Sequence, residues 1–463
     1  MLLFSLVLVA FYFPLSLLAQ RPVVDTADIG RYVTKEMRAD RVPGLGIVVV
    51  TRDSVLYAQG FGSTGRKGES VTADTPFLLG SMSKSVTALA IMQLVEAGRV
   101  HLDSPVVRYL PDFVVEGTGA AKITVRHLLA HTSGIPASAP RAHGSGRSLA
   151  SHIVALHDVE LASEPGATHE YSSPNYQVLG RLVEVVSGEP FAAYVQRNVF
   201  GPLGMRRSFA DSLGARASGL ARGHQMIFGM PLARDLPFEG DRLPAAALVS
   251  TAGDMGRFLQ AQLREGELNG ARVASIAAFR EMHKPQVQSE GFAYAMGWRV
   301  NPFAGGTAVH HGGILPNYRG KMVLLPELGV AVVVLTNVSS VIGAPTSHRV
   351  ADGVAGLMAG RAPAEPRWSL VWFLSAVALG MVAITALQIR GLLRARRGPR
   401  QVRGAMKELV FAGLLLLGPP LLLNFEWVEI LRQTPDVGSW MLISAALGAV
   451  TAAYNARGIR QSS

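Results

Sequence analysis

Three apolar runs near the C-terminal end of the chain constrain its structure most. Residues 368–389 and 439–454 contain no charged side chain, and residues 408–425 contain only Glu408 at their start. About 20 such residues cross a bilayer as a helix, because lipid offers the backbone polar groups no other partners. One such run would be equally typical of a buried core helix. Three in succession predict a membrane region of three transmembrane helices, within residues 368–455, after a separate domain.

The charged residues around these runs predict their orientation. Short loops rich in Lys and Arg stay in the cytoplasm. The loop between the second and third runs carries both signs of charge, so it can lie outside. The first loop is strongly basic, and it holds Arg390, Arg394, Arg396, Arg397, Arg400, Arg403 and Lys407. We therefore expect a multi-pass protein of the cell membrane whose larger, N-terminal part is extracytoplasmic.

The N-terminal end also predicts export. Residues 1–19 have no charged side chain and are rich in Leu, Val and Phe, which is typical of a signal peptide or an uncleaved signal anchor. We divide the chain into this leader at 1–20, a domain at 21–359, a linker at 360–367, the membrane region and a cytoplasmic tail at 456–463. The chain has no cysteine, which excludes disulfides and thiolate metal sites.

The net charge argues against a nucleic-acid partner. The formal net charge is +11, of which residues 367–463 contribute +7, leaving only +4 for residues 1–366. This basic excess serves membrane topology and contact with anionic lipid. We expect the lipid bilayer as a partner, and the sequence names no protein partner.

Ser81-Met82-Ser83-Lys84 stands at the start of a long apolar stretch. Residues three apart share a helix face, so Lys84 would lie one turn from Ser81. Burial lowers the pKa of a lysine, and a neutral amine can take the proton of a serine that then attacks acyl carbons. The same pattern fits a capping serine followed by a surface lysine. Acyl transfer is predicted only if partner residues exist elsewhere.

Two other segments supply such partners. Tyr171 follows a Pro-Gly turn and precedes a predicted helix, so its phenol would lie on a loop and could relay protons. Thr307 begins a run, T-A-V-H-H-G-G, that joins an alternating strand to paired glycines. Glycine allows close backbone approach, so the Gly313 amide could act with the Ser81 amide as an oxyanion donor. Taken alone, Tyr171 would be a tyrosine that covers the edge of the core, and His310 would be a strand histidine hydrogen-bonded to its neighbours.

In order and together, these segments resemble the penicillin-recognising serine hydrolases, in the branch of class C β-lactamases, D-alanyl-D-alanine carboxypeptidases and related esterases. The resemblance covers about Val42 to Asn337. It includes segments that look structural, namely Ile123–Gly134, Phe200–Met205, Ser250–Met255, Met296–Trp298 and Leu335–Asn337. It implies an α+β, β-lactamase/penicillin-binding-protein-like fold in which an antiparallel sheet is flanked by helices and joined by a mostly helical subdomain.

The resemblance also implies a role for each matching residue. Ser81 would be the nucleophile, Lys84 the base that activates it, and Tyr171 a partner in the proton relay. His310 would replace the lysine of the third family motif, near the substrate's acidic end or the Tyr171 oxygen. The amides of Ser81 and Gly313 would form the oxyanion hole. No metal or organic cofactor is implied.

The chain departs from the family at two of these positions. Ser173 stands where the family often has asparagine, and a hydroxyl cannot offer both an amide donor and a carbonyl acceptor. His310 replaces a lysine, and its charge is not assured at neutral pH. If His310 bound a carboxylate, activity on such substrates would fall above about pH 6.5. We expect Ser173, His311 and Gly312 to contact substrate, whose class stays open.

The local pattern fits this architecture. Helices are expected at 25–40, 78–100, 179–186 and 347–358, a hairpin at 44–50 and 54–60, and strands at 297–300, 308–311, 321–325 and 329–336. The strands near the two ends of the domain would then unite in one sheet. The function that fits best is a membrane-tethered, extracytoplasmic serine hydrolase that cleaves ester or amide bonds through an acyl-enzyme. Its expected substrate is a small molecule or peptide of the cell envelope. A β-lactamase, a D-Ala-D-Ala carboxypeptidase and a non-enzymatic penicillin-binding receptor are the alternatives.

Overall fold

We analysed a computed structural model of the 463-residue chain, which describes residues 25–117, 119–140, 148–339, 346–363, 370–398, 402–423 and 427–456. The predicted leader at 1–20 lies outside the described residues. So do parts of the predicted linker and nearly all of the predicted tail.

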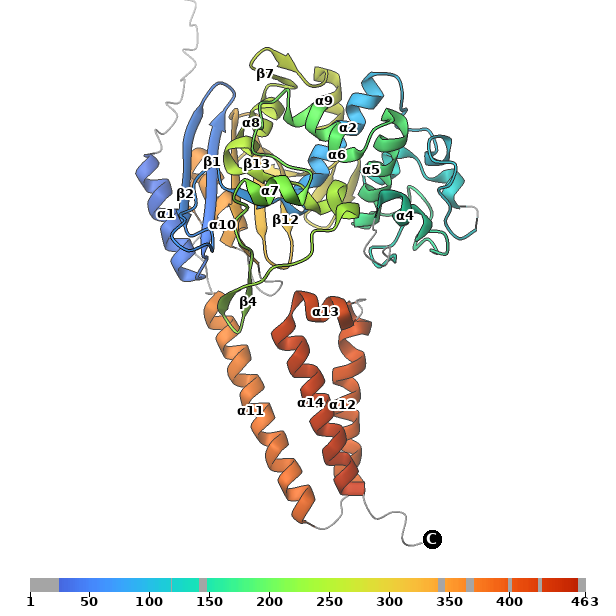
Figure 1. Cartoon of the computed structure of the whole chain (residues 1–463), viewed down its shortest axis with the longest axis vertical. Coiled ribbons are helices and arrows are strands. Elements are labelled where there is room, and N and C mark those ends of the chain that lie inside the picture. The colour runs from blue at the N-terminus through green and yellow to red at the C-terminus, as the bar shows by residue number, and fades with distance from the viewer. Residues whose placement is uncertain are drawn as a thin grey trace, which may run out of the picture.

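An eight-stranded antiparallel sheet forms the centre of the larger domain (Figure 1). The strand order is β2-β1-β14-β13-β12-β11-β10-β9. The strands are β1 Gly44–Thr51, β2 Val55–Gly62, β9 Val287–Ser289, β10 Phe292–Tyr294, β11 Arg299–Phe303, β12 Gly306–Ile314, β13 Arg319–Leu325 and β14 Val330–Thr336. Strand β1 pairs with β14, with Val48 opposite Val333. The predicted union of strands from both ends of the domain is confirmed.

Helices cover both faces of this sheet. Alternate residues of β1 enter different cores, because side chains of a strand alternate between its faces. Ile47 and Val49 belong to the cluster packed under α1 (Thr26–Ala39) and α10 (Thr346–Met358). Val48 and Val50 belong to the larger cluster that contains α8 (Ala252–Leu263) and α2 (Ser83–Glu96). The all-apolar sequences of β1 and β14 follow from this two-sided burial.

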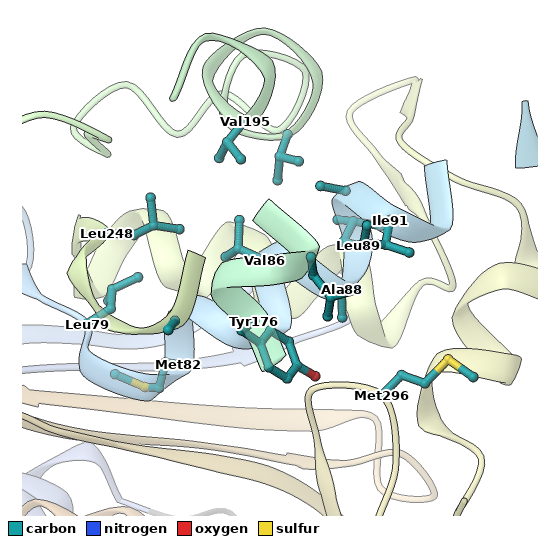
Figure 2. Packing of buried hydrophobic residues seen from close by; sticks show 14 of the residues in the cluster. Leu79, Met82, Val86, Ala88, Leu89, Ile91, Tyr176, Val195, Leu248 and Met296 are labelled. Atoms are coloured by element: carbon teal, nitrogen blue, oxygen red, sulfur yellow. The ribbon is translucent and has the colours of Figure 1, made fainter. Parts of the chain in front are cut away.

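The larger cluster surrounds α2 on all sides (Figure 2). Val86, Leu89 and Ile91 are fully buried although they point in different directions around the helix. A helix that is apolar all round is typical of a domain core. Every position in the first two turns of α2 is therefore buried, including that of Lys84.

The remaining elements form the helical subdomain and its connections. The helices and short 3-10 or π turns are η1 Gly80–Met82, η2 Val106–Arg108, η3 Gly119–Lys122, α3 Val125–Leu129, α4 Leu149–Val154, α5 Ser173–Ser187, α6 Phe191–Val195, η4 Gln196–Phe200, α7 Ser212–Ala217, η5 Gly240–Arg242, η6 Leu243–Ala247 and α9 Ile276–His283. The short strands are β3 Pro76–Leu78, β4 His224–Ile227, β5 Met230–Ala233, β6 Val249–Thr251, β7 Glu267–Leu268, β8 Ala271–Arg272 and β15 Val338–Ser339. The α+β, β-lactamase-like architecture is confirmed.

Three long helices extend away from this domain (Figure 1). They are α11 Leu370–Arg397, α12 Val402–Leu423 and α14 Pro435–Ala456, and the short α13 Trp427–Gln433 connects the last two. All three are long and apolar enough to cross a membrane. Gln388 on α11 and Ser444 on α14 hydrogen-bond through their side chains at 2.7 Å. A polar pair between helices has few competing partners in lipid, so it fixes α11 against α14.

Candidate active site

Ser81 lies in the 3-10 turn η1, between β3 and α2. Gly80 has φ +57°, a left-handed conformation that favours glycine. The Ser83 hydroxyl donates to the Gly80 carbonyl at 2.8 Å and accepts from the Leu248 amide at 3.2 Å. These two hydrogen bonds therefore hold the turn from its buried side. Ser81 lies on the other side of the turn and is half-buried.

Lys84 is completely buried beneath this turn. Its Nζ lies 2.9 Å from the Ala245 carbonyl oxygen, 3.3 Å from Ser173 Oγ and 3.3 Å from Ser81 Oγ. A neutral amine has two protons and one lone pair, so it can donate to Ala245 and Ser173 and accept from Ser81. Burial, and then the charges of Arg242 and Arg299, hold the pKa of Lys84 well below its usual 10.5. This environment favours the neutral amine that a base requires.

Tyr171 lies beside Lys84 and Ser81, as the sequence predicts. Its ring centroid is 4.9 Å from Lys84 Nζ. Burial raises the pKa of Tyr171 to about 12, although a hydrogen bond with Ser81 and the charge of Arg299 oppose the rise. The phenol therefore keeps its proton at neutral pH. Ser81, Lys84 and Tyr171 thus bring together a hydroxyl, a buried amine whose pKa is lowered, and a protonated phenol.

His131 holds the loop that carries Tyr171. Its Nδ1 accepts from the Ser172 amide at 3.2 Å, and its ring packs 4.4 Å from that of Tyr171. His131 has φ +58°, which is uncommon for a residue other than glycine. Burial first, and then the charge of Lys84, keep the pKa of His131 well below 6.5. This neutral, buried histidine is a positioning residue that motif reasoning assigned only to a structural segment.

The backbone of Gly313 packs directly against the residues of η1, the turn that carries Ser81. A Cβ atom built on Gly313 would lie only 1.9 Å from the Leu79 carbonyl oxygen. A Cβ built on Gly80 would lie 2.6 Å from the Ile314 nitrogen. Both positions therefore require glycine, and their contact brings the end of β12 against η1. This is the approach that an oxyanion hole shared by Ser81 and Gly313 needs.

The two histidines of β12 face opposite sides of the sheet. His311 is buried on the active-site side, 6.2 Å from the Tyr171 ring, with Nε2 3.3 Å from Tyr294 Oη. Its Nδ1 donates to the Gly312 carbonyl at 2.7 Å. His310 instead has Nε2 2.6 Å from Asn301 Oδ1. His311, not His310, lies next to Tyr171, because neighbouring strand residues alternate between faces.

The structure therefore corrects the expectations for His310 and Gly312. Burial, and then the charges of Lys321 and Arg299, lower the pKa of His310 to about 3. A neutral imidazole offers no charge to a carboxylate at neutral pH. A Cβ on Gly312 would lie 2.5 Å from His348 Nε2 of α10, so Gly312 faces the helix rather than the substrate side. Ser173, which we expected to hold substrate, contacts Lys84 instead.

A cation next to Tyr171 is one that the sequence analysis did not predict. Arg299 begins β11, and its guanidinium carbon lies 5.6 Å from the Tyr171 ring centroid and 4.5 Å from that of Phe292. Its Nε is buried and has no hydrogen-bond partner among the described residues. The sequence offers a partial signal, since Arg299 directly follows the Met296–Trp298 segment. Only the folded structure shows that its guanidinium contacts Tyr171 and Phe292.

Among the described residues, no cluster of three or more His, Asp or Glu side chains could hold a metal ion. A serine, a buried neutral amine and a protonated phenol within contact form a set that can activate a hydroxyl and return a proton to a leaving group.

Residues 29–355 match the protein family described as Beta-lactamase. The chain belongs to the beta-lactamase family. This match covers most of the chain and confirms the resemblance to penicillin-recognising serine hydrolases. The three long apolar helices α11, α12 and α14 lie outside the matched residues.

Several relatives are similar to this chain over about two thirds of its length. "Protein flp" of Staphylococcus aureus is 26% identical over 321 residues, which cover 67% of this chain and 63% of the relative. The chain thus spans less than two thirds of that relative's length. "Penicillin-binding protein 4" of Amycolatopsis lactamdurans is 31% identical over 311 residues, covering 64% of this chain and 81% of the relative.

Solved structures agree on the fold. The octameric penicillin-binding protein homologue from Pyrococcus abyssi superposes with a TM-score of 0.66 at 28% identity, covering 73% of this chain and 78% of that one. The D-alanine carboxypeptidase AmpC from Burkholderia cenocepacia superposes with a TM-score of 0.59 at 22% identity, covering 70% and 99%. At that identity the second comparison supports the fold alone.

Proposed function

We propose that the protein is a membrane-tethered serine hydrolase that cleaves ester or small amide bonds through an acyl-enzyme on Ser81. One observation carries the proposal. Lys84 is completely buried, within hydrogen-bond distance of Ser81, and next to two positive charges that favour its neutral form. A module that only bound a ligand would have no need to keep a neutral base beside its serine.

The reaction follows from the positions of these groups. Lys84 takes the Ser81 proton as Oγ attacks the substrate carbonyl carbon, and the amides of Ser81 and Gly313 stabilise the resulting oxyanion. The proton then passes through Tyr171 to the leaving oxygen or nitrogen, and the scissile bond breaks. Water, deprotonated by the same groups, attacks the ester on Ser81. The acid is released and Ser81 regains its proton.

A second substrate class is favoured by Arg299. Its guanidinium, close to Tyr171, could pair with a carboxylate at the end of a substrate. Penicillins and peptides ending in D-Ala carry such a group. The names of the Amycolatopsis relative and of the Burkholderia structure refer to penicillin binding and to D-alanine carboxypeptidase activity. Neutral esters do not need this contact, so the two classes are distinguishable by experiment.

We also propose that the catalytic domain is extracytoplasmic. The last turn of α11 carries Arg394, Arg396 and Arg397, at the end of the helix remote from the catalytic domain (Figure 1). Basic residues next to transmembrane helices stay in the cytoplasm. The opposite ends of the helices, and the catalytic domain with them, would then face the envelope.

Mass spectrometry of the full-length protein in detergent tests the proposal. Separate samples are exposed to a fluorophosphonate, a penicillin and short-chain nitrophenyl esters. Trypsin releases residues 68–84 as one peptide that contains both Ser81 and Ser83, so fragmentation must separate the two hydroxyls. We expect the adduct on Ser81, ester turnover in solution, and loss of both in Ser81→Ala. An adduct on Ser83, or turnover that survives Ser81→Ala, would refute the mechanism.

A further inference from the structure

The β4–β5 hairpin lies where the larger domain meets the long apolar helices. Gln225 Nε2 of β4 donates to the carbonyl oxygen of Arg432, on α13, at 3.0 Å. The Phe228 amide, at the hairpin tip, donates to Asp436 Oδ2, at the start of α14, at 2.9 Å. Arg432 also pairs with Glu239 of the larger domain at 3.4 Å. These contacts hold the hairpin against α13 and the first turn of α14.

The hairpin also contacts the start of α11, and Figure 1 shows β4 reaching toward the upper end of that helix. A Cβ built on Gly229 would lie 3.6 Å from the Val371 carbonyl oxygen and 3.8 Å from Leu374 Cβ. Met226 of β4 belongs to the same small buried cluster as Leu374. The two apolar spans that flank the hairpin begin at Val371 and at Pro435. The hairpin tip therefore lies at the level where both spans begin.

Three apolar side chains of this hairpin are exposed. Phe228, Met230 and Leu232 are 45%, 51% and 52% exposed. Met230 and Leu232 are alternate residues of β5, so they project from the same face of the hairpin. Trp372 is also exposed in the first turn of α11, and tryptophan is enriched at the boundary between membrane and water. Apolar side chains gathered at this level are typical of a surface that contacts lipid.

The turn at the hairpin tip is unusual for its sequence. Ile227 pairs with Met230, so Phe228 and Gly229 form a two-residue loop. Phe228 has φ +48° and Gly229 has φ +77°, as in a type I′ turn, whose first position favours Asn, Asp or Gly. A bulky residue in this conformation is strained, and such strain is concentrated at functional sites. Because the Phe228 ring is not buried in the protein, packing within the chain does not explain why phenylalanine occupies this position.

We propose that the β4–β5 hairpin inserts Phe228, Met230 and Leu232 into the headgroup boundary of the bilayer that holds α11, α12 and α14. Lipid is the occupant of this surface because the hairpin tip lies against the first turns of two membrane spans. Arg41 Nη1 donates to the Gly229 carbonyl oxygen at 3.3 Å, which brings a cation to the level of the anionic headgroups. The inference rests on the three helices lying in the bilayer and is independent of the reaction at Ser81.

Insertion of the hairpin would fix how the larger domain sits on the membrane. The segment between Gly313 and β13 is bonded to both strands of the hairpin at its base. Asn317 Nδ2 donates to the Arg234 carbonyl oxygen at 2.9 Å, and the His224 amide donates to the Asn317 carbonyl oxygen at 3.2 Å. The domain would thus have a second attachment to the bilayer besides α11, and the active site would stay at a constant height above the lipid.

Single spin labels test this inference, because the chain contains no cysteine to remove. The full-length Met230→Cys protein carries a nitroxide and is reconstituted in vesicles of phosphatidylcholine and phosphatidylglycerol. Electron paramagnetic resonance power saturation measures collisions of the label with oxygen and with a water-soluble nickel chelate. Leu56→Cys on the distant strand β2 is the exposed control in water, and Leu379→Cys within α11 is the exposed control in lipid.

We expect the ratio of oxygen to nickel collisions at Met230 to be at least about threefold higher than at Leu56, because oxygen concentrates in hydrocarbon and the chelate stays in water. The ratio at Leu379 should be higher still. Leu232→Cys repeats the measurement if Met230→Cys does not reconstitute.

Each other outcome overturns the inference in a distinct way. A ratio at Met230 equal to that at Leu56 would mean that the hairpin lies in water. A label shielded from both oxygen and nickel would mean that protein covers the hairpin, and spin–spin broadening would identify that protein as a second copy of this chain. Nickel collisions at Leu379 as frequent as those at Leu56 would mean that α11 is outside the bilayer, so that the membrane placement fails together with the hairpin.

Discussion

Gly313→Ala should inactivate the protein more than it unfolds it. The added methyl carbon would start 1.9 Å from the Leu79 carbonyl oxygen, and real Cβ atoms essentially never come within 3.0 Å of such an atom. The end of β12 and the turn η1 must therefore separate by about 1.1 Å. A displacement of about 1 Å at reacting groups costs on the order of 10²-fold, and loss of an oxyanion donor costs about 10²- to 10³-fold. We expect kcat/KM to fall by about 10²- to 10³-fold, or about 2.7 to 4 kcal/mol of transition-state stabilisation.

Gly312→Ala is the matched control for this experiment. Its methyl carbon would lie 2.5 Å from His348 Nε2, on the face of β12 covered by α10. Both variants overpack a buried contact and should lose about 1 to 3 kcal/mol of stability. Only Gly313→Ala displaces η1, the turn that carries Ser81. The rate of Ser81 acylation and the urea unfolding midpoint would be measured for both. Equal loss of activity in the two variants, or full activity in Gly313→Ala, would refute the oxyanion-hole geometry.

Three further predictions concern the base, the cation and the membrane topology. Lys84→Ala should slow the acylation of Ser81 by about 10²- to 10⁴-fold. In the wild type, the acylation rate should rise with pH as Lys84 loses its proton and level off well below pH 10.5. A rise that ends only near pH 10.5 would contradict the lowered pKa of Lys84. Because the pKa of His310 is about 3, carboxylate substrates should show no activity change near pH 6.5. Arg299→Gln should raise KM for penicillins at least about tenfold more than KM for neutral esters, because its other effect, a higher pKa of Lys84, is shared by both classes; equal changes in the two classes, measured by steady-state kinetics, would contradict a carboxylate contact. A cytoplasm-dependent reporter fused after Arg403 should be active and one fused after Asp436 inactive, and the reverse result would invert the proposed orientation.

The sequence predicts that Ser81, Lys84 and Tyr171 lie together, because the spacing within each motif and the order of the motifs are both visible in it. The exact form of the turn could not be predicted. We expected one helix over 78–100, but Leu78 ends the strand β3, Gly80 adopts a left-handed conformation, and α2 begins only at Ser83. The Ser-x-x-Lys spacing still brings the two side chains within 3.3 Å, because a 3-10 turn also places residues three apart on one side.

The assignment of His310 failed for a different reason. Alternation along β12 predicts that His310 and His311 face opposite sides, but not which side each one faces. That choice depends on which segments cover each face of β12: α10 lies against the Gly312 side and the residues next to η1 lie against the Gly313 side, and both segments are distant from the motif in sequence. Arg299 lies opposite His310 in the sheet, yet its long side chain reaches the Tyr171 ring, which strand alternation alone would not predict. Long-range contacts such as Arg432 with Glu239 carry no local signal at all, so the junction between the two regions emerged only from the structure.

The burial of Lys84 ties the protonation of this proposed base to the folding equilibrium. In the unfolded chain this amine would hold its proton up to about pH 10.5, whereas in the folded protein it releases the proton well below that value. Between these two values the unfolded state binds more protons, so the stability of the fold rises with pH. Folding itself therefore deprotonates the base before any substrate arrives. Acidification would reverse both effects together, so a loss of catalytic competence at low pH would also report an early weakening of the domain core.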